Sequence, residues 1–278
     1  MCYWSLGIFL LYSSPAYAQS ISSYLQHTPQ QVLQELVKAD VVYLGETHDS
    51  LKDHQAQLEI LQKLYQRQPK MAIALEMFQR PYQNVLNRYI AGDLSEQELL
   101  EQSEYNQRWG FPWQYYAPIL QFAKEKQLPV LALNTPTEVT RQVARAGLES
   151  LTPQQRQFIP PFTEIRTDNA EYRQTLLRIF NQHQTGHSSA SFERFFLAQV
   201  LWDETMAERI AQFIYAHPDY QVVVLAGRGH IAYGYGIPSR VARRLNNQQL
   251  VQRSVLFGTS EEVTTDEKPI ADFVLNSD

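Results

Sequence analysis

The sequence predicts an α/β protein in which a parallel sheet is flanked by helices and a helical lobe lies over the carboxyl edge of the sheet. Three observations support this fold class. Short apolar runs recur along the chain without regular polar alternation, which is typical of strands buried on both faces. Helical stretches separate these runs, as in βαβ units. Glycine and polar residues follow several runs directly, at the points where strands should end.

Five apolar runs are predicted to form the main strands of the sheet. They are rich in Val, Ile, Leu and Ala, and polar residues bound them. In chain order they span residues 41–44, 71–75, 129–133, 221–226 and 251–257. A sixth run, 270–275, follows an acidic stretch, and we expect it to form an edge strand.

Four capping boxes mark predicted helix starts. In each, a Thr or Ser hydroxyl can accept a backbone N–H three residues on, where a Gln or Glu side chain can reach back. The pairs are Thr28 with Gln31, Ser95 with Glu98, Thr135 with Glu138, and Thr152 with Gln155. Two mainly helical excursions, at about 79–127 and 138–219, are longer than a crossover needs, and we expect them to be helical insertions that form the lobe.

The first 18 residues resemble a secretory signal peptide. They carry no charged side chain, contain a short apolar run and end in Ala16-Tyr17-Ala18, a cleavage pattern. We expect cleavage there, leaving residues 19–278 as a single soluble domain in an extracytoplasmic compartment, with the periplasm as the expected place. The alternative is a buried N-terminal strand or helix. The lone cysteine, Cys2, would leave with the signal, so the mature chain could form no disulfide.

Composition excludes two classes of protein. Hydrophobic residues make up 44% of the chain, which is typical of a globular protein and not of a disordered one. The net charge is −5 and the Lys and Arg residues are dispersed, whereas a nucleic-acid binder usually carries a basic face. We therefore expect no nucleic-acid partner.

Side chains able to do chemistry follow four of the predicted strands. Because the carboxyl ends of parallel strands share one edge of a sheet, and that edge is where α/β proteins bind ligands, these residues should converge on a site. The residues are Glu46, His48, Glu76, Asn134, Arg228 and His230. Gly45 and Gly229 are expected to let the backbone turn sharply beside it. The alternative is a set of ordinary helix caps, with Glu46 or Thr47 starting the next helix.

Several segments resemble the ChaN family of haem-binding, iron-regulated proteins. The resemblance rests on YLGETHDSLKDH, ALEMFQRPYQNVLNRYIAGDLSE, RWGFPWQYYAPIL, FERFFLAQVLWDETMAERIA and VVVLAGRGHIAYGYGIPSRVARR, and it covers roughly residues 30–258. The wider superfamily includes the Tiki proteases, the TraB/PrgY proteins and the erythromycin esterases. The resemblance implies that Glu46, His48, Glu76 and His230 form the polar cluster of the superfamily.

The ChaN resemblance implies haem held at a dimer interface, with a tyrosine on the iron and basic or imidazole groups of the other subunit near the propionates. Imidazole is the alternative iron ligand. The candidate haem-binding residues are Tyr116, Tyr233, Tyr235, His48, His230 and Arg228. A homodimer that forms on haem binding and an outer-membrane haem or iron transport system are the implied partners. ChaN proteins are lipoproteins, and the absence of a visible lipobox here is a departure from the family.

An aromatic segment, a second histidine and three arginines can each be assigned either to the site or to another part of the structure. The aromatic segment Trp109 to Trp113 can line an apolar haem pocket or belong to the core. We expect His54 to lie on a helix surface and not to act as a second ligand. Arg240, Arg243 and Arg244 share one helical face, which can receive propionates but is more often solvated.

Two other functions fit the same residues. The first is a hydrolase of the protease or esterase kind, in which Glu46, His48, Glu76 and His230 would be catalytic. A divalent metal bound there, or His48 acting as a general base without metal, would activate water. The second is a non-catalytic interaction domain, which leaves the clustered charges unexplained.

Overall fold

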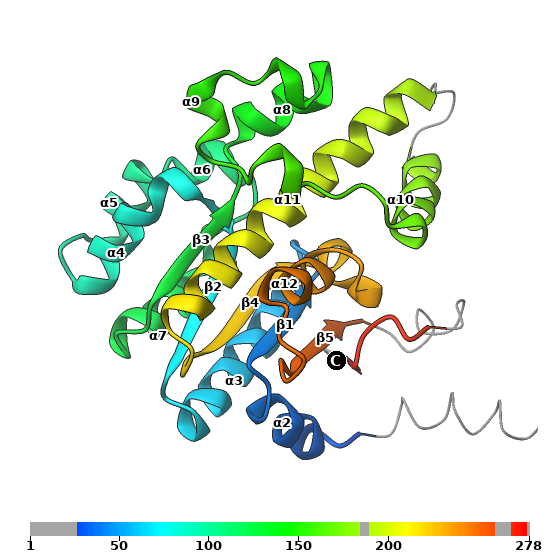
Figure 1. Cartoon of the computed structure of the whole chain (residues 1–278). Coiled ribbons are helices and arrows are strands. Elements are labelled where there is room, and N and C mark those ends of the chain that lie inside the picture. The colour runs from blue at the N-terminus through cyan, green and yellow to red at the C-terminus, as the bar shows by residue number, and fades with distance from the viewer. Residues whose placement is uncertain (1–26, 184–188, 259–267, 277–278) are drawn as a thin grey trace, which may run out of the picture.

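The computed structural model describes residues 27–183, 189–258 and 268–276. Its centre is a six-stranded, all-parallel sheet with the strand order β3-β2-β4-β1-β5-β6 (Figure 1). The strands are β1 (Val41–Glu46), β2 (Met71–Gln79), β3 (Val130–Asn134), β4 (Gln221–Gly227), β5 (Gln252–Phe257) and β6 (Phe273–Leu275). All six predicted strands are confirmed, and β6 is the short edge strand that the sequence indicated.

Helices cover both faces and one end of the sheet. Those from the first half of the chain are α2 (Pro29–Val37), α3 (Leu51–Arg67), α4 (Gln83–Ala91), α5 (Glu96–Gln102), α6 (Tyr105–Arg108) and α7 (Ala117–Glu125). Those from the second half are α8 (Thr137–Ala146), α9 (Pro153–Arg156), α10 (Ala170–His183), α11 (Ser189–Ala216) and α12 (Ile237–Leu245). Short 3₁₀ turns join them, among them η5 (Arg228–His230) directly after β4.

Alternate residues of each central strand enter two separate hydrophobic cores. On one face, Leu44 and Leu225 pack among buried residues of α2, α3, α4 and α7. On the other, Tyr43 and Val224 pack among buried residues of α11 and α12, which cross the near face in Figure 1. Burial on both faces explains why the strands read as continuous apolar runs.

Three of the four predicted capping boxes are confirmed, at Thr28, Ser95 and Thr152. The prediction at Thr135 was wrong, because α8 begins at Thr137 after Pro136 and has no side-chain cap. Thr135 is instead buried at the carboxyl edge of the sheet. The helix after β1 is capped by Ser50, which accepts from the Asp53 amide, so neither Glu46 nor Thr47 caps it.

The two predicted helical excursions occupy different places. In the first, α4 and α7 pack on the face of the sheet with α2 and α3. The second builds the lobe over the carboxyl edge, where α8, α9 and α10 lie beyond the strand ends in Figure 1. Two small cores, one between α10 and α11 and one between α8, α11 and the segments on either side of α9, hold the lobe together.

Gly45 is required for space and not for a special backbone turn. A Cβ atom at this position would lie 2.3 Å from Cδ2 of Leu256, which is fully buried, and 3.3 Å from the Arg228 Cα atom. A Cβ at Gly229 would meet nothing within 4 Å, and neither glycine has a left-handed φ. The expected role of Gly229 in the turn was therefore wrong.

We expect Gly45→Ala to lower the free energy of unfolding by about 1–3 kcal/mol, because the added methyl group overpacks a core that cannot relax freely. Gly229→Ala is the matched control, and its free energy of unfolding should lie within about 0.5 kcal/mol of the wild-type value. Urea denaturation followed by circular dichroism measures both. Equal stability of the two variants would contradict this account of Gly45.

Candidate functional site

A pocket of about 740 Å³ lies at the carboxyl edge of the sheet, under the helical lobe. His48, Glu76, Asn134 and His230 line it from four strand ends, as the sequence predicted. Aromatic side chains form much of the remaining wall: Trp109, Phe111, Phe180, Phe195 and Trp202. Of the predicted edge residues, Glu46 lies behind His48, and Arg228 is not part of the lining.

Glu46 is held by three donors beneath the pocket. It is the last residue of β1 and is almost completely buried. Its Oε1 accepts from the Tyr116 hydroxyl at 2.6 Å and from His48 Nδ1 at 2.9 Å. Its Oε2 accepts from Gln57 Nε2 at 2.8 Å. A buried carboxylate with this many donors is well compensated, and it fixes the orientation of the His48 ring.

His48 is the member of this group that faces the pocket, and its side chain is 27% exposed. The Trp109 and Phe111 rings lie against it, each with its centre 4.9 Å away. Burial alone lowers the pKa of His48, but the hydrogen bond to Glu46 and the charges of Glu76 and Glu46 outweigh it and hold the pKa above its usual value. Of the aromatic segment, Trp109 and Phe111 line the pocket, and Trp113 belongs to the core.

Gly227, the last residue of β4, makes room for the His48 ring. A Cβ atom there would lie 2.8 Å from Nε2 and Cε1 of His48. The Gly227 amide also donates to Glu76 Oε2 at 2.7 Å. This glycine therefore lets the imidazole approach the backbone and helps to fix Glu76.

A second polar group surrounds His230. Its Nδ1 lies 2.7 Å from Oδ1 of Asp203 on α11, and its Nε2 lies 3.4 Å from Oε1 of Glu76. The Tyr172 hydroxyl of α10 donates to the other oxygen of Asp203. These contacts connect the helical lobe to the strand ends through buried, hydrogen-bonded groups.

The charges in this second group stabilise one another. Burial alone lowers the pKa of His230, but the carboxylates of Glu76 and Asp203 raise it to about 10. Burial raises the pKa of Glu76, but the charges and hydrogen bonds of His230, with further help from His48 and the Gly227 amide, lower it to about 2. At neutral pH His230 is therefore a cation between two carboxylates.

Several residues of the site were not predicted from the sequence. Asp203 pairs with His230 and accepts from the Tyr172 hydroxyl, and Gln57 donates to the carboxylate of Glu46. His54 was predicted on a helix surface, but it is buried, with its Nε2 3.1 Å from the His48 carbonyl. One signal could have identified Asp203: it is an acidic residue within the apolar stripe of a 28-residue helix.

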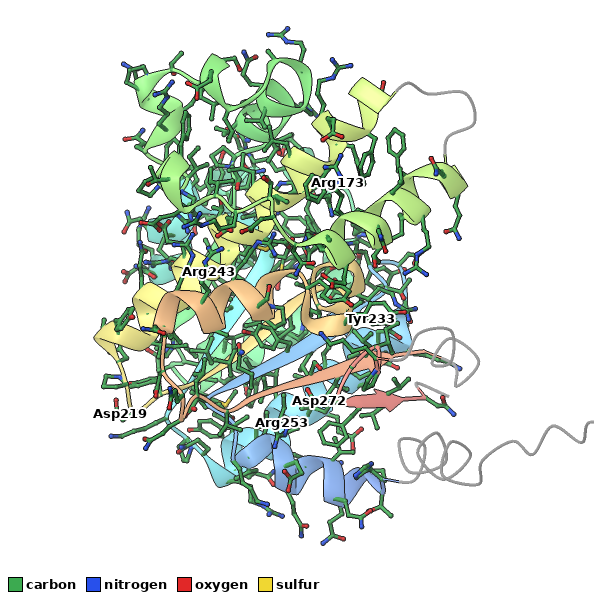
Figure 2. All side chains as sticks on the ribbon, turned by 45° about the vertical axis from the view of Figure 1, so that its right-hand side comes forward. Arg173, Asp219, Tyr233, Arg243, Arg253 and Asp272 are labelled. Atoms are coloured by element: carbon green, nitrogen blue, oxygen red, sulfur yellow. The ribbon has the colours of Figure 1, made fainter. Side chains whose placement is uncertain are left out.

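The three tyrosine candidates lie away from the pocket lining. Tyr116 is fully buried, and its hydroxyl is engaged by Glu46. Tyr233 and Tyr235 are partly buried, and their rings stack with centres 5.6 Å apart. Figure 2 shows Tyr233 near the carboxyl end of β5, and it lines a smaller cavity with Asp272.

The arginines of α12 do not form a solvated face. Arg240, Arg243 and Arg244 all contact the carboxylate of Glu204, which is fully buried on α11. Figure 2 shows Arg243 on the side of α12 that faces α11. Glu204 is internal, and Arg240 and Arg244 are not exposed, so the expectation of a solvated face was wrong for these two, whereas Arg243 is exposed.

The described part of the chain offers neither a metal centre nor a membrane-spanning helix. Within it, no group of three or more His, Cys, Asp or Glu side chains is arranged to hold a metal ion, so the suggested divalent metal is not supported. None of its helices is long and apolar enough to cross a membrane. The predicted signal peptide, residues 1–18, lies outside the described residues.

We expect Asp203→Asn to lower the pKa of His230 from about 10 toward its usual value, because a buried anionic partner is lost. The pKa of His230 is about 10 in the folded protein and about 6.5 in the unfolded chain. Protonation of His230 therefore stabilises the fold fully below about pH 6.5, and this stabilisation is lost as the pH rises through about 10. The variant should therefore lose about 3 kcal/mol of unfolding free energy at pH 6 and less at pH 10.

Urea denaturation at the two pH values, with NMR titration of the His230 ring, measures this effect. Asp219→Asn is the control, because Asp219 pairs with Lys70 at the exposed end of the molecule. If Asp203→Asn loses the same unfolding free energy at both pH values, the proposed role of the Asp203 charge is contradicted.

Comparisons with known proteins agree with the fold and identify the family. A profile described as "Haem-binding uptake, Tiki superfamily, ChaN" matches residues 32–241. The structure titled "Cofacial heme binding to ChaN of Campylobacter jejuni" superposes with a TM-score of 0.70 at 20% identity, covering 91% of this chain and 93% of that one.

A curated relative comes from a plant. Protein RETICULATA-RELATED 5, chloroplastic, of Arabidopsis thaliana is 28% identical over 268 residues, which is 88% of this chain and 35% of the relative. The chain thus spans about a third of that protein's length. Because the family profile covers most of the chain, the protein belongs to the ChaN family of haem-binding uptake proteins in the Tiki superfamily.

Proposed function

We propose that this protein binds haem in the pocket at the carboxyl edge of the sheet and that the His48 imidazole binds the iron. One observation carries the proposal: His48 faces an aromatic pocket while its Nδ1 is held by the buried carboxylate of Glu46. Imidazole is a common haem ligand, and a carboxylate on the far nitrogen fixes the ring and makes it a stronger base. Nε2 is the nitrogen left for iron.

The pocket residues fit a haem group. The volume of about 740 Å³ lies within the usual range of ligand pockets, roughly 300–1,000 Å³. Trp109 and Phe111 offer apolar surface beside His48. Asn134 Oδ1 is buried at the pocket and has no hydrogen-bond partner in the described part of the chain, so a ligand or water is needed to satisfy it.

Tyrosine ligation, which the family resemblance implied, is the alternative proposal, with Tyr233 or Tyr235 as the ligand beside the smaller cavity. For Tyr116 we propose a different role. Burial and the charge of Glu46 hold the pKa of the Tyr116 hydroxyl far above its usual value, which opposes the tyrosinate that iron would need. Tyr116 then serves to orient Glu46, and Glu46 orients His48.

The finer features of the function are also proposals. The Campylobacter jejuni protein is described as binding haem cofacially, which supports a pair of haems between two copies of this chain. As a secretory signal peptide, residues 1–18 would direct export of the protein to the periplasm and would then be removed. There it would serve haem or iron acquisition together with an outer-membrane transport system.

We expect residues 19–278 to give a saturable Soret shift with haemin and a monomer-to-dimer change in light scattering. His48→Ala should abolish the shift, and Glu46→Gln should weaken binding about 10- to 100-fold by releasing the ring. His217→Ala is the control, since His217 is exposed and contacts the rings of Phe213 and Tyr220 away from the pocket. Loss of the Soret shift in Tyr233→Phe or Tyr235→Phe, with His48→Ala unaffected, would reject imidazole ligation.

The Glu46–His48 pair also favours a second function, hydrolysis of an ester or amide. His48 Nε2 would take a proton from water while the oxygen attacks the acyl carbon. The bond to the leaving group would then break, and His48 would return the proton to that group. The Glu46 carboxylate would hold the imidazole in the required orientation, and Glu76 with His230 would complete the polar wall.

The hydrolytic function predicts turnover of ester or peptide substrates by haem-free protein. His48→Ala and Glu46→Gln should each lower the rate, by about 10²–10⁴-fold for the general base. A panel of chromogenic esters and labelled peptides provides the measurement, again with His217→Ala as the control. If neither substrate class is hydrolysed, or if His48→Ala retains the rate, the site is not a hydrolase of this kind.

A further inference from the structure

Two amide side chains of the pocket lining make no hydrogen bond within the described part of the chain. Asn134 ends β3 and is 9% exposed, and its Oδ1 is buried without a partner there. Gln199 lies on α11, is half-buried, and bonds to no described residue. The third amide of the lining, Gln79, differs, because it donates to Thr137 at 2.7 Å and accepts from Arg108 at 3.0 Å. Asn134 and Gln199 are therefore the two lining amides that a ligand can satisfy.

The residue after Asn134 adds a hydroxyl to this set. Thr135 is buried and lines the pocket, and its Oγ1 has no partner within residues 27–183, 189–258 and 268–276. It was expected to cap the next helix, but α8 begins at Thr137 without a side-chain cap. A buried polar group without a partner is costly, so such groups are usually satisfied by ordered water or by a ligand. Three neutral polar side chains of one pocket are in this state.

The packing of α11 on the sheet brings Gln199 to the end of β3. Leu133 of β3 belongs to the same core as Met206 and Ile210 of α11. Gln199 precedes Met206 by about two helical turns and so lies on the same side of α11. The side of the helix that covers the strand therefore continues past the strand end, where Gln199 and Asn134 line the same pocket.

The chemistry of this wall fits a neutral amide. A carboxamide has N–H donors beside a C=O acceptor, and another amide offers the same two groups in return. Phe195 and Trp202, which lie one turn from Gln199 on either side, also line the pocket and present apolar surface. The porphyrin of ferric haem offers no N–H or O–H donor to Asn134 Oδ1, because iron replaces the pyrrole protons and the propionates are ionised. Haem binding therefore does not account for this wall.

We propose that Asn134 and Gln199, together with Thr135, form an amide-binding subsite. It takes a neutral N–H and C=O edge of a ligand whose apolar part lies against Phe195 and Trp202. The subsite would favour an amide over a ketone or ester of the same shape. This inference goes beyond the haem and hydrolytic functions, because it rests on the pocket lining alone. An open-chain amide and a ring lactam present the same edge, so the experiment contains one arm for each.

Fragments that differ in the N–H group test the subsite. N-benzylacetamide and 4-phenylbutan-2-one have nearly the same shape, with a CH₂ group in the ketone where the amide has N–H. The wild-type protein should bind the amide about tenfold more tightly. Asn134→Leu and Gln199→Met, which nearly keep side-chain size, should each remove most of this preference and leave ketone binding unchanged. Titrations followed by ¹H–¹⁵N NMR of the side-chain NH₂ groups measure the affinities.

The lactam arm compares 2-quinolone with 1-methyl-2-quinolone, whose N–H is masked. The amide with the larger preference over its masked partner identifies the source of the group. Gln212→Met is the control, because Gln212 is exposed on α11 outside the lining. Neither lining variant removes a hydrogen bond of the described chain, so their urea midpoints should match the wild-type value. Matching midpoints separate a loss of binding from a loss of the fold.

Three results would overturn the subsite: no binding of any fragment, equal affinities within both pairs, or a preference that survives in the double variant. The first two would mean that water alone satisfies the wall. The titrations need neither iron nor turnover. Failure of the haem or hydrolytic function would therefore leave this test valid, and failure of the subsite would leave those functions standing.

Discussion

The buried carboxylates of Glu46 and Glu76 are the constraint on which the site depends. Parallel strands covered on both faces leave the carboxyl edge as the place where polar groups can end a strand. A charge buried there is stable only if donors surround it. The carboxylate of Glu46 accepts hydrogen bonds from Tyr116, Gln57 and His48. The carboxylate of Glu76 pairs with His230 and accepts from the Gly227 amide.

The same constraint explains why the lobe is attached where it is. His230 neutralises Glu76, but a buried imidazolium needs a second anion to orient it. Asp203 provides that anion from the middle of α11, and Tyr172 of α10 satisfies the remaining oxygen. The lobe is therefore connected to the sheet by polar contacts as well as by the apolar core between α11 and the strands, and the pocket lies between the two layers.

Local patterns predicted most of the fold and part of the site. The six strands and three of the helix caps could be predicted because apolar runs and capping boxes depend only on residues close together in the sequence. The burial of His54 could not be predicted, because it depends on Tyr115 and Tyr116, which lie about 60 residues further along the chain and pack against it. Arg240 and Arg244 of α12 were misjudged for the same reason, since their partner Glu204 lies on another helix. Composition and spacing do not show which distant helix supplies a counter-charge.

Charge is distributed unevenly along the pocket, and this bears on what it can hold. At the strand ends, three buried carboxylates, those of Glu46, Glu76 and Asp203, share the two imidazoles of His48 and His230. Two arginines of the lining have no partner in the described chain, and they are Arg141 of α8 and Arg194 of α11. A neutral apolar ligand would leave them unpaired, whereas a ligand with one acidic end would satisfy them. An acidic end on the ligand would be favoured there over a neutral one in either proposed function.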